Sequence, residues 1–319
     1  MNLLLKHKIK IYFSNLNLLK YEKSKSKIVL MYHGIIPKGK SHFNNRFISL
    51  RQFQKQIKFL AKEFNIVSLD DYFLNQNLTD DKVNVALTFD DGYRNNFKYA
   101  FPVLKKYNVP AHFFVTGLNN LNSKVKIIWS DLVDIASTEI STLNFDNKVL
   151  GSKVDFKTDF HNYFRENPIS GLEKYLNLID IITNRCKGLF SEKKIKDFWE
   201  LMNDDEIHEV SNSNLVSIGS HGYFHNNLSK LSLRDAEQEI DQSINYLNQI
   251  TNSKINSIGF PDGSYNNKIS EYCLSKGLKF QCAVNYSSLE DELKRHLINR
   301  LGIYPPVSPK FLEYQIHSC

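Results

Sequence analysis

Residues 85–92 read VALTFDDG, an apolar run that ends abruptly in two carboxylates and a glycine. The first five residues are rich in β-formers and predict a buried strand, and Gly92 permits a sharp turn directly after it. Adjacent side chains of a strand point to opposite faces, but a turn here would bring Asp90 and Asp91 into one pocket with different surroundings. Asp-Asp-Gly is also common as a plain turn or a helix N-cap, so this stretch alone leaves both interpretations open.

The segments around this strand alternate between strand and helix patterns. Apolar runs that predict strands occupy residues 28–32, 111–115 and 215–218. Apolar residues at intervals of three and four predict helices over residues 51–64, 97–104 and 232–250, the second of them made irregular by Pro102. Such alternation favours right-handed crossovers and a mainly parallel sheet, either open or closed into a barrel. We therefore expect an α/β fold.

Two parts of the chain depart from this alternation. Residues 119–210 contain polar and helical segments, including 172–182 and 195–202, and are interpreted as a mainly helical insertion that caps one face. The expected division is a basic N-terminal segment, residues 1–27, followed by one domain over residues 28–319.

The N-terminal segment carries apolar residues at helical spacing among lysines. Residues 1–22 could therefore lie on an anionic membrane surface, and a surface helix packed on the domain is the alternative. Lysines interrupt the leucines at positions 3–5 before they reach the length of a signal-peptide core. The sequence thus predicts no signal peptide and a cytoplasmic protein, or one peripheral to the inner membrane.

Composition excludes several classes of protein. The 319 residues are 42% hydrophobic and 24% charged, which fits a folded domain and not a disordered chain. No run of about 18 apolar residues occurs, which excludes an integral membrane protein. The net charge of +7 would suit nucleic acid, an anionic membrane or an acidic glycan. No nucleic-acid motif accompanies it, and the four cysteines form no C-x-x-C pair.

Two further clusters follow apolar strands. Residues 220–225 read SHGYFH, and His221 and His225 would share one face if the segment were helical, which suits a divalent metal. A pair of ordinary surface or capping histidines is the alternative. Joined to one Asp, two His form a familiar hydrolytic metal site with open positions for water. Residues 260–265, FPDGSY, indicate no more than a turn by themselves.

In this order the three clusters resemble the NodB-homology polysaccharide deacetylases, carbohydrate esterase family 4. Residues 88–92, TFDDG, match the family's first motif in full. Residues 221–228 match its second motif, H-[ST]-x-x-H-x-x-L, except that Gly222 replaces the hydroxyl residue. The third motif lacks the arginine of Arg-x-Pro-Tyr. Residues 31–33, MYH, resemble a permuted branch in which this early histidine replaces one near the C-terminus.

The resemblance spans roughly residues 28–305 apart from the insertion, and it implies a distorted (β/α) barrel with a metal site. It assigns a divalent cation, zinc first among the candidates, to Asp91, His221 and His225. Asp90 is then the general base and His33 the general acid, with His317 near the chain end as the rival for that role. Substrate-binding residues are expected at Phe260, Pro261 and Tyr265.

The implied function is the metal-dependent removal of N-acetyl groups from an amino sugar of a polysaccharide or lipid-linked glycan. This hydrolysis of a carbon–nitrogen bond would serve the synthesis of a cell-envelope polysaccharide. The alternatives are a deformylase or other amide hydrolase on the same scaffold, or a catalytically inactive carbohydrate-binding homologue. The sequence does not identify the sugar, its linkage or the metal.

Overall fold

The computed structural model describes residues 26–38, 44–151, 156–186, 188–191, 196–305 and 307–318. The membrane contact expected for residues 1–22 falls outside these ranges, as does almost all of the expected segment 1–27. Among the helices within the ranges, none is both long enough and apolar enough to cross a bilayer.

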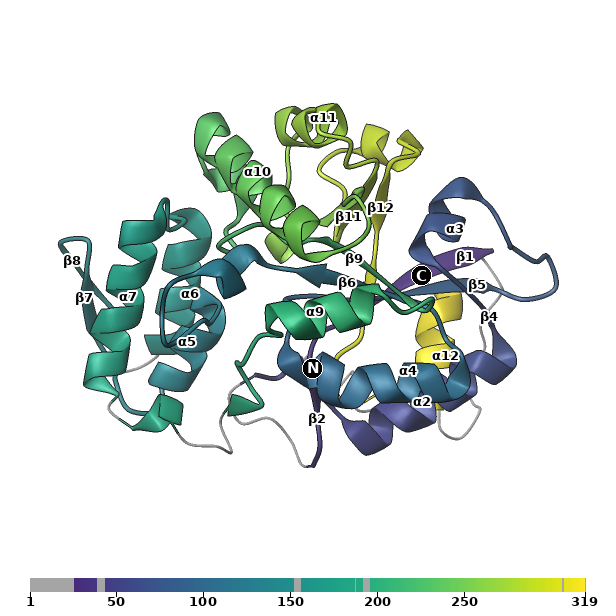
Figure 1. Ribbon diagram of the computed structural model, residues 1–319, viewed down its shortest axis with the longest axis horizontal. Helices are drawn as coiled ribbons and strands as arrows, with labels where there is room; N and C mark the ends of the chain where they lie inside the picture. Colours follow the sequence, from purple (N-terminus) through teal and green to yellow (C-terminus); the bar gives the residue numbers. More distant parts are fainter. Residues whose placement is uncertain are drawn as a thin grey trace, which may run out of the picture.

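One sheet of nine parallel strands forms the centre of the described structure (Figure 1). Its inner strands are buried on both faces, which is why they are continuous apolar runs and not alternating ones. In chain order the strands are β1 (Lys27–Tyr32), β4 (Asn65–Val67), β5 (Asn84–Phe89), β6 (Ala111–Val115), β9 (Val216–Ser220), β10 (Ser257–Gly259), β11 (Phe280–Ala283), β12 (Leu297–Asn299) and β13 (Leu301–Gly302). A separate short pair joins β2 (Ile35–Ile36) to β3 (Ile48–Ser49).

The two edges of the sheet come together in one short stretch of chain. The spatial order is β12-β11-β10-β9-β6-β5-β1-β13, with β4 beside β5. Its first and last members, β12 and β13, are consecutive in sequence and separated only by Arg300. Residues 297–302 therefore link the two edges and nearly close the sheet into a barrel. The expected α/β fold with a distorted barrel is confirmed.

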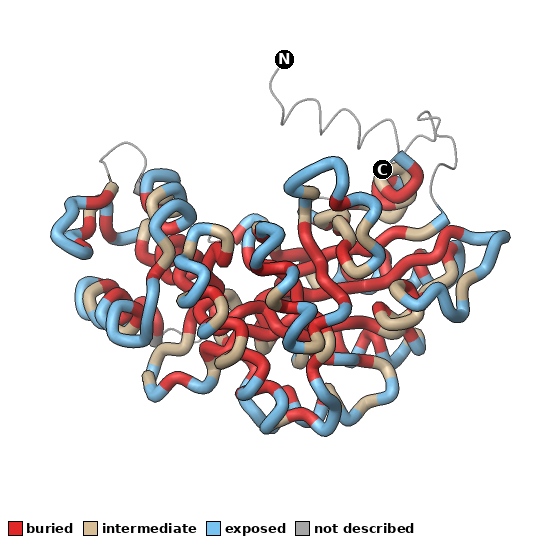
Figure 2. The backbone as a smooth tube through the Cα atoms, turned by 90° about the horizontal axis from the view of Figure 1, so that it is seen from above, coloured by how far each residue is buried: buried red, intermediate tan, exposed pale blue. Residues whose placement is uncertain are grey.

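Helices cover the outside of this barrel. In Figure 1, α2 and α4 lie side by side below the sheet with α12 next to α2, whereas α10 and α11 pack together above it. Figure 2 shows the buried strands at the centre and exposed residues on the outer faces of the helices. The helices are α2 (Leu50–Glu63), α3 (Leu69–Leu74), α4 (Phe101–Tyr107), α9 (Asp204–Ser211), α10 (Leu233–Ile250), α11 (Asn267–Ser275) and α12 (Pro309–Ser318).

Two of these helices illustrate how sequence sets their bounds. The Ser49 hydroxyl caps α2 by accepting a hydrogen bond from the Gln52 N–H. The helix expected over residues 97–104 begins as a π-helical turn, Asn96–Ala100, and continues as α4. Pro102 is the second residue of α4 and directly follows the π-helical turn, so the residue that has no backbone N–H lies where the helical hydrogen-bond pattern changes.

The predicted insertion, residues 119–210, contains helices α5 (Trp129–Ala136), α6 (Phe156–Glu166) and α7 (Leu172–Arg185) and the hairpin β7 (Leu143–Phe145)–β8 (Lys148–Leu150). These elements lie at one end of the molecule, on the left of Figure 1. The helix expected over residues 195–202 is wrong for residues 197–202: residue 196 is helical, but residues 197–199 form a turn. Leu201 then pairs with Tyr93 in an isolated β-bridge because the chain runs beside the loop after β5. The domain limits themselves stay predictions.

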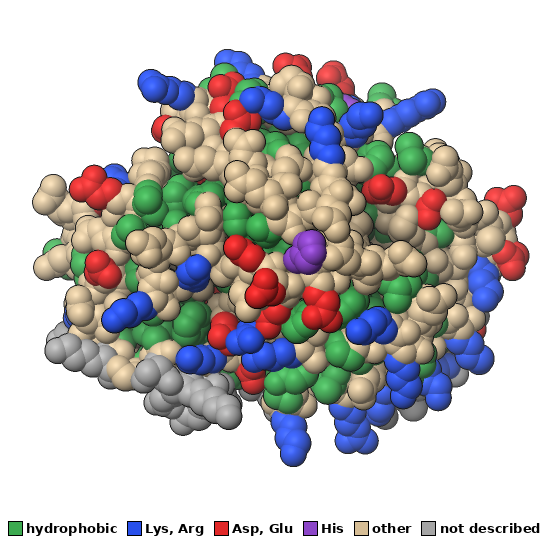
Figure 3. All heavy atoms as spheres, viewed as in Figure 1, with side chains coloured by type: hydrophobic (Ala, Val, Ile, Leu, Met, Phe, Trp, Pro, Cys, Tyr) green, Lys and Arg blue, Asp and Glu red, His purple; other side chains and the backbone are tan. Residues whose placement is uncertain are grey.

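Charged side chains of both signs are mixed on the face seen in Figure 3, although Lys and Arg gather along its lower edge. The net charge of +7 is therefore not concentrated in one groove on that face. The distribution of charge on this face therefore gives no support to the interpretation that the protein binds nucleic acid.

Candidate active site

The polar clusters follow the carboxyl ends of parallel strands, so the fold brings them to one edge of the sheet. Asp90 and Asp91 follow β5, and His221 follows β9. His33 follows β1, which pairs with β5 along its whole length, and the Asp90 N–H donates to the Tyr32 carbonyl at 3.0 Å. Parallel α/β sheets hold their ligands at this edge.

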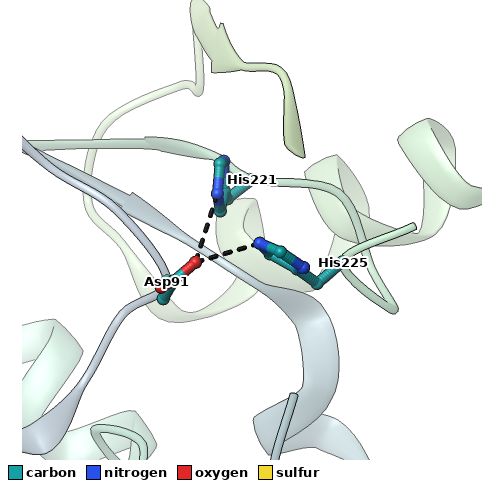
Figure 4. Close-up of side chains that lie close together, drawn as sticks. All are labelled: Asp91, His221 and His225. Atoms are coloured by element: carbon teal, nitrogen blue, oxygen red, sulfur yellow. Dashed lines mark ion pairs between the residues drawn. The ribbon is translucent and has the colours of Figure 1, made fainter. Parts of the chain in front are cut away.

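Three buried side chains point at one another in Figure 4. The Asp91 Oδ1 atom is 3.3 Å from the His221 Nε2 atom and 3.0 Å from the His225 Nε2 atom. One ligand atom from each of the three residues lies within 4.8 Å of the others. Burial would raise the pKa of Asp91, but its contacts with the two imidazoles lower that pKa well below its usual value. The buried triad therefore carries a carboxylate.

These residues fit a metal by their chemistry. The His221 Nδ1 atom lies 2.6 Å from the Gly259 carbonyl oxygen, so Nδ1 carries the hydrogen and Nε2 is left with its lone pair. Among the described residues, neither Asp91 oxygen has a hydrogen-bond donor, although both are buried. The nearest guanidinium, that of Arg46, is 3.7 Å from the Asp91 Oδ2 atom, which leaves Oδ1 facing the two imidazoles. Two His with one Asp is a donor set that zinc and related divalent metals accept.

The loop that carries the two histidines is not helical, so the condition under which their spacing would place them on one face is not met. Gly222 has φ 70° and His225 has φ 58°, and these left-handed residues turn the chain so that both rings face Asp91. At Gly222 a side chain would also meet Glu239, because an added Cβ would lie 3.0 Å from the Glu239 Oε1 atom. A side chain at position 222 would therefore be strained in this loop.

Asp90 has a different partner from Asp91. Arg300 donates to both of its carboxylate oxygens, from Nη1 at 2.6 Å and from Nη2 at 2.8 Å, and also donates from Nη1 to the Thr88 hydroxyl. Burial would raise the pKa of Asp90, but the Arg300 guanidinium outweighs this and lowers it. The third sequence motif has no arginine, and the barrel closure supplies one. Sequence reasoning missed Arg300, and its only sign in the sequence was a single charged residue between the short apolar segments 297–298 and 301–303.

A second arginine lies on the other side of Asp91. The Arg46 Nη1 atom is 3.7 Å from the Asp91 Oδ2 atom, and its Nη2 atom is 3.3 Å from the Asp131 Oδ1 atom. The Tyr93 hydroxyl donates to Asp131 at 2.6 Å. Burial raises the pKa of Asp131 to about 7 despite the nearby Arg46. Arg46 and Asp131 were not predicted, because neither belongs to a motif.

His33 and its rival occupy opposite ends of the sheet. His33 is buried beside Asp90, and burial followed by the charge of Arg46 lowers its pKa to about 4. His33 is therefore neutral at pH 7 in the free protein, which opposes the expected imidazolium. His317 lies on α12 with its ring 5.9 Å from that of Phe64, which precedes β4 at the far end of the strands.

The expected substrate residues follow β10 but are buried. The rings of Phe260 and Tyr265 stack at 5.2 Å, and Pro261 is buried between them in sequence. The Tyr265 hydroxyl donates to Asp291 at 2.7 Å. This packing leaves little of either ring for a substrate, and the substrate role of all three residues stays a prediction.

The sequence profile of the polysaccharide deacetylase family matches residues 77–144 and 184–281, more than half of the chain. The chain belongs to the polysaccharide deacetylase family. The expected family is confirmed, and the expected enzyme class, a carbohydrate deacetylase that hydrolyses a carbon–nitrogen bond, agrees with it. The permuted branch suggested by residues 31–33 stays a prediction.

Two curated relatives belong to this deacetylase group by name. The name of YxkH from Bacillus subtilis (strain 168) describes a polysaccharide deacetylase. This relative is 35% identical over 103 residues, which cover 31% of this chain and 35% of YxkH. The poly-beta-1,6-N-acetyl-D-glucosamine N-deacetylase of Staphylococcus epidermidis is 28% identical over 211 residues, which cover 59% of this chain and 70% of the relative. The chain thus spans about a third of the first relative's length.

Solved deacetylase structures share the fold. The Streptococcus pyogenes deacetylase PplD in complex with acetate has a TM-score of 0.56 at 19% identity, covering 91% of this chain and 97% of PplD. IcaB from Ammonifex degensii has a TM-score of 0.56 at 17% identity, covering 93% of this chain and all of IcaB. At these identities the similarity establishes the fold alone.

Proposed function

We propose that this protein is a metal-dependent hydrolase that removes N-acetyl groups from an amino sugar of a polysaccharide or lipid-linked glycan. The observation that supports it is the meeting of Asp91, His221 and His225 beside a second carboxylate that Arg300 holds apart. β-1,6-linked N-acetylglucosamine chains are the first substrate class to test, because the relative from Staphylococcus epidermidis is named for them.

The triad would hold the cation through the Nε2 atoms of His221 and His225 and the carboxylate of Asp91. A bound divalent ion, zinc as first choice, would polarise the amide carbonyl and lower the pKa of a water molecule towards about 7. Asp91 would bind the cation and Asp90 would not, so the two adjacent carboxylates would have different roles.

Asp90 would take the proton of the attacking water. Its pKa, lowered by Arg300, keeps it a carboxylate at neutral pH, and the two guanidinium hydrogen bonds fix its orientation. The proton for the departing amine is assigned to His33. Because its pKa of about 4 leaves the ring neutral, His33 would have to take up a proton from solvent before it gives one to the departing amine. An unchanged rate and pH profile in His33→Ala would move this role elsewhere.

The test begins with elemental analysis of the purified full chain, followed by acetate release from β-1,6-linked N-acetylglucosamine oligomers and a panel of other N-acetylated glycans. We expect acetate release that a chelator abolishes and added zinc restores. Formate release from an N-formylated glycan in place of acetate would favour the deformylase alternative. A metal-loaded protein that releases neither acid would indicate an inactive carbohydrate-binding homologue.

Two variants test the division of work. Asp90→Asn should keep its metal and lose about 10²- to 10⁴-fold in turnover, the usual contribution of a general base. His221→Ala should lose both the metal and the activity. His317→Ala serves as the matched control, because His317 lies on α12 with its ring against Phe64, away from the site. Wild-type turnover in zinc-loaded Asp90→Asn would refute the base assignment.

A further inference from the structure

His225 has a backbone conformation that non-glycine residues seldom adopt. Its φ of 58° places it in the left-handed region, and the residue is buried. Such a conformation persists only where the surrounding structure holds it in place. Since this conformation also aims the ring at Asp91, whatever holds the backbone of His225 also positions its imidazole.

One support comes from α10. The N–H groups of Phe224 and Asn226, on either side of His225, both donate to the Glu239 Oε1 atom, at 3.0 Å and 3.3 Å. The Asn226 side chain donates to the other oxygen of the same buried carboxylate at 3.0 Å. One glutamate thus holds the peptide groups before and after the histidine.

The other support comes from the predicted insertion. The indole N–H of Trp129 donates to the His225 carbonyl oxygen at 3.0 Å, in a buried hydrogen bond. Trp129 is the first residue of α5, and the rings of His161 and Phe164 pack against it at 5.5 Å and 5.6 Å. The indole therefore has little freedom to leave the carbonyl.

A second hydrogen-bonded link joins the insertion to the same loop. The Ile169 N–H donates to the Asn226 Oδ1 atom, and the Asn226 Nδ2 atom donates to the Ile169 carbonyl, both at 3.0 Å. The ring of Tyr175 on α7 also stacks on Phe224 at 5.2 Å. Phe224, His225 and Asn226 therefore all contact the predicted insertion, residues 119–210.

Building on the proposed function, we propose that the insertion positions the metal-binding histidine His225, and that Trp129 is the positioning residue through which it does so. The cation affinity of the site then depends on a hydrogen bond from outside the barrel. Without the indole N–H, the carbonyl of His225 loses its partner and the residue can relax towards negative φ, which turns the imidazole away from Asp91. Hydrogen bonds that orient ligands typically change metal affinity by about 10- to 100-fold when they are removed.

The chain offers a matched control for this residue. It has two tryptophans, and the other, Trp199, is also buried within the predicted insertion. Among the described residues, the indole nitrogen of Trp199 has no hydrogen-bond partner. Trp129→Phe and Trp199→Phe therefore remove the same atoms, but only the first removes a hydrogen bond to His225.

The experiment measures the zinc affinity of the full-length wild type and both variants by competition with a chromophoric chelator. Thermal unfolding of the metal-free proteins is measured in parallel. We expect Trp129→Phe to bind zinc about 10- to 100-fold more weakly and Trp199→Phe to bind it as the wild type does. Equal affinity of Trp129→Phe and wild type would overturn the inference, as would an equal loss in both variants. Wild-type protein that binds no metal would overturn the proposed function as well.

A second measurement covers the case in which Trp129→Phe does not fold. The ¹⁵N spectrum of the wild type should show two indole N–H signals, which Trp199→Phe assigns. Zinc should shift the Trp129 signal more than the Trp199 signal, because only the former is bonded to a residue expected to bind the ion. Equal responses of the two signals would contradict the positioning role.

Discussion

The side chains of Asp90 and Asp91 are neighbours in sequence but interact with different residues in the fold. Asp91 faces two imidazoles, whereas Asp90 is held by the guanidinium of Arg300. The motif predicted that these two residues would matter, because their type and place after a strand can be read locally. Arg300 could not be predicted in this way, because it lies 210 residues from Asp90 in the chain and no spacing rule links them.

The Arg300–Asp90 pair predicts how a variant shifts the pH dependence. In Arg300→Met, burial is no longer opposed by the guanidinium, so the pKa of Asp90 should rise. Because the base must be deprotonated, the acidic limb of the pH–rate profile should move to higher pH. Leaving a buried charge unpaired should also lower the free energy of unfolding by about 3–5 kcal/mol.

A pH–rate profile measures the shift of the acidic limb, and urea unfolding measures the change in the free energy of unfolding. Arg295→Met, at an exposed arginine nearby, is the control. An unchanged acidic limb in Arg300→Met would contradict the conclusion that Arg300 lowers the pKa of Asp90.

At the scale of elements, the loop after β9 shows where local reasoning succeeds and where it fails. The spacing of His221 and His225 indicated that they would share one face if the segment were helical. The structure reaches the same convergence through two left-handed residues, one of which is Gly222. A glycine within a motif could have suggested a turn, but the partners that hold this loop come from α5 and α10, which sequence spacing does not reveal.

Gly222→Ala should therefore weaken both the fold and the metal site. A left-handed conformation costs a non-glycine residue about 1–2 kcal/mol, and the new Cβ would press on Glu239 at 3.0 Å. We expect a lower free energy of unfolding and weaker zinc binding. Gly277→Ala provides the comparison, because Gly277 also has positive φ (88°) but its added Cβ would meet no atom nearer than 3.9 Å. That variant should lose stability without losing zinc affinity; parallel losses of affinity in both would argue against a local effect.

At the scale of the whole molecule, the alternation of strands and helices predicted the barrel class. It did not predict how the barrel closes, because β12 and β13 have three and two residues and are too short to show a period. The role of residues 119–210 was equally hidden, since their contacts with the histidine loop are made across the fold. The candidate ligands come from two separate crossovers, after β5 and after β9.

A cation that joins these two crossovers should stabilise the entire fold. Ligand binding to the folded state alone raises the free energy of unfolding by about 2.7 kcal/mol at a free ligand concentration 100 times the Kd. We expect a chelator to lower the Tm of the wild type and added zinc to restore it. His221→Ala should show no response to either treatment, whereas His317→Ala should respond as the wild type does. An identical Tm with and without metal in the wild type would contradict a shared ion.

The closing stretch at residues 297–302 has a consequence for biosynthesis. Arg300 is synthesised after β5 and β9, so a nascent chain that has already formed these two strands still has Asp90 without its guanidinium. Under the proposed function, hydrolysis would then begin only after residues 297–302 have docked, because Asp90 lacks its guanidinium partner until that step.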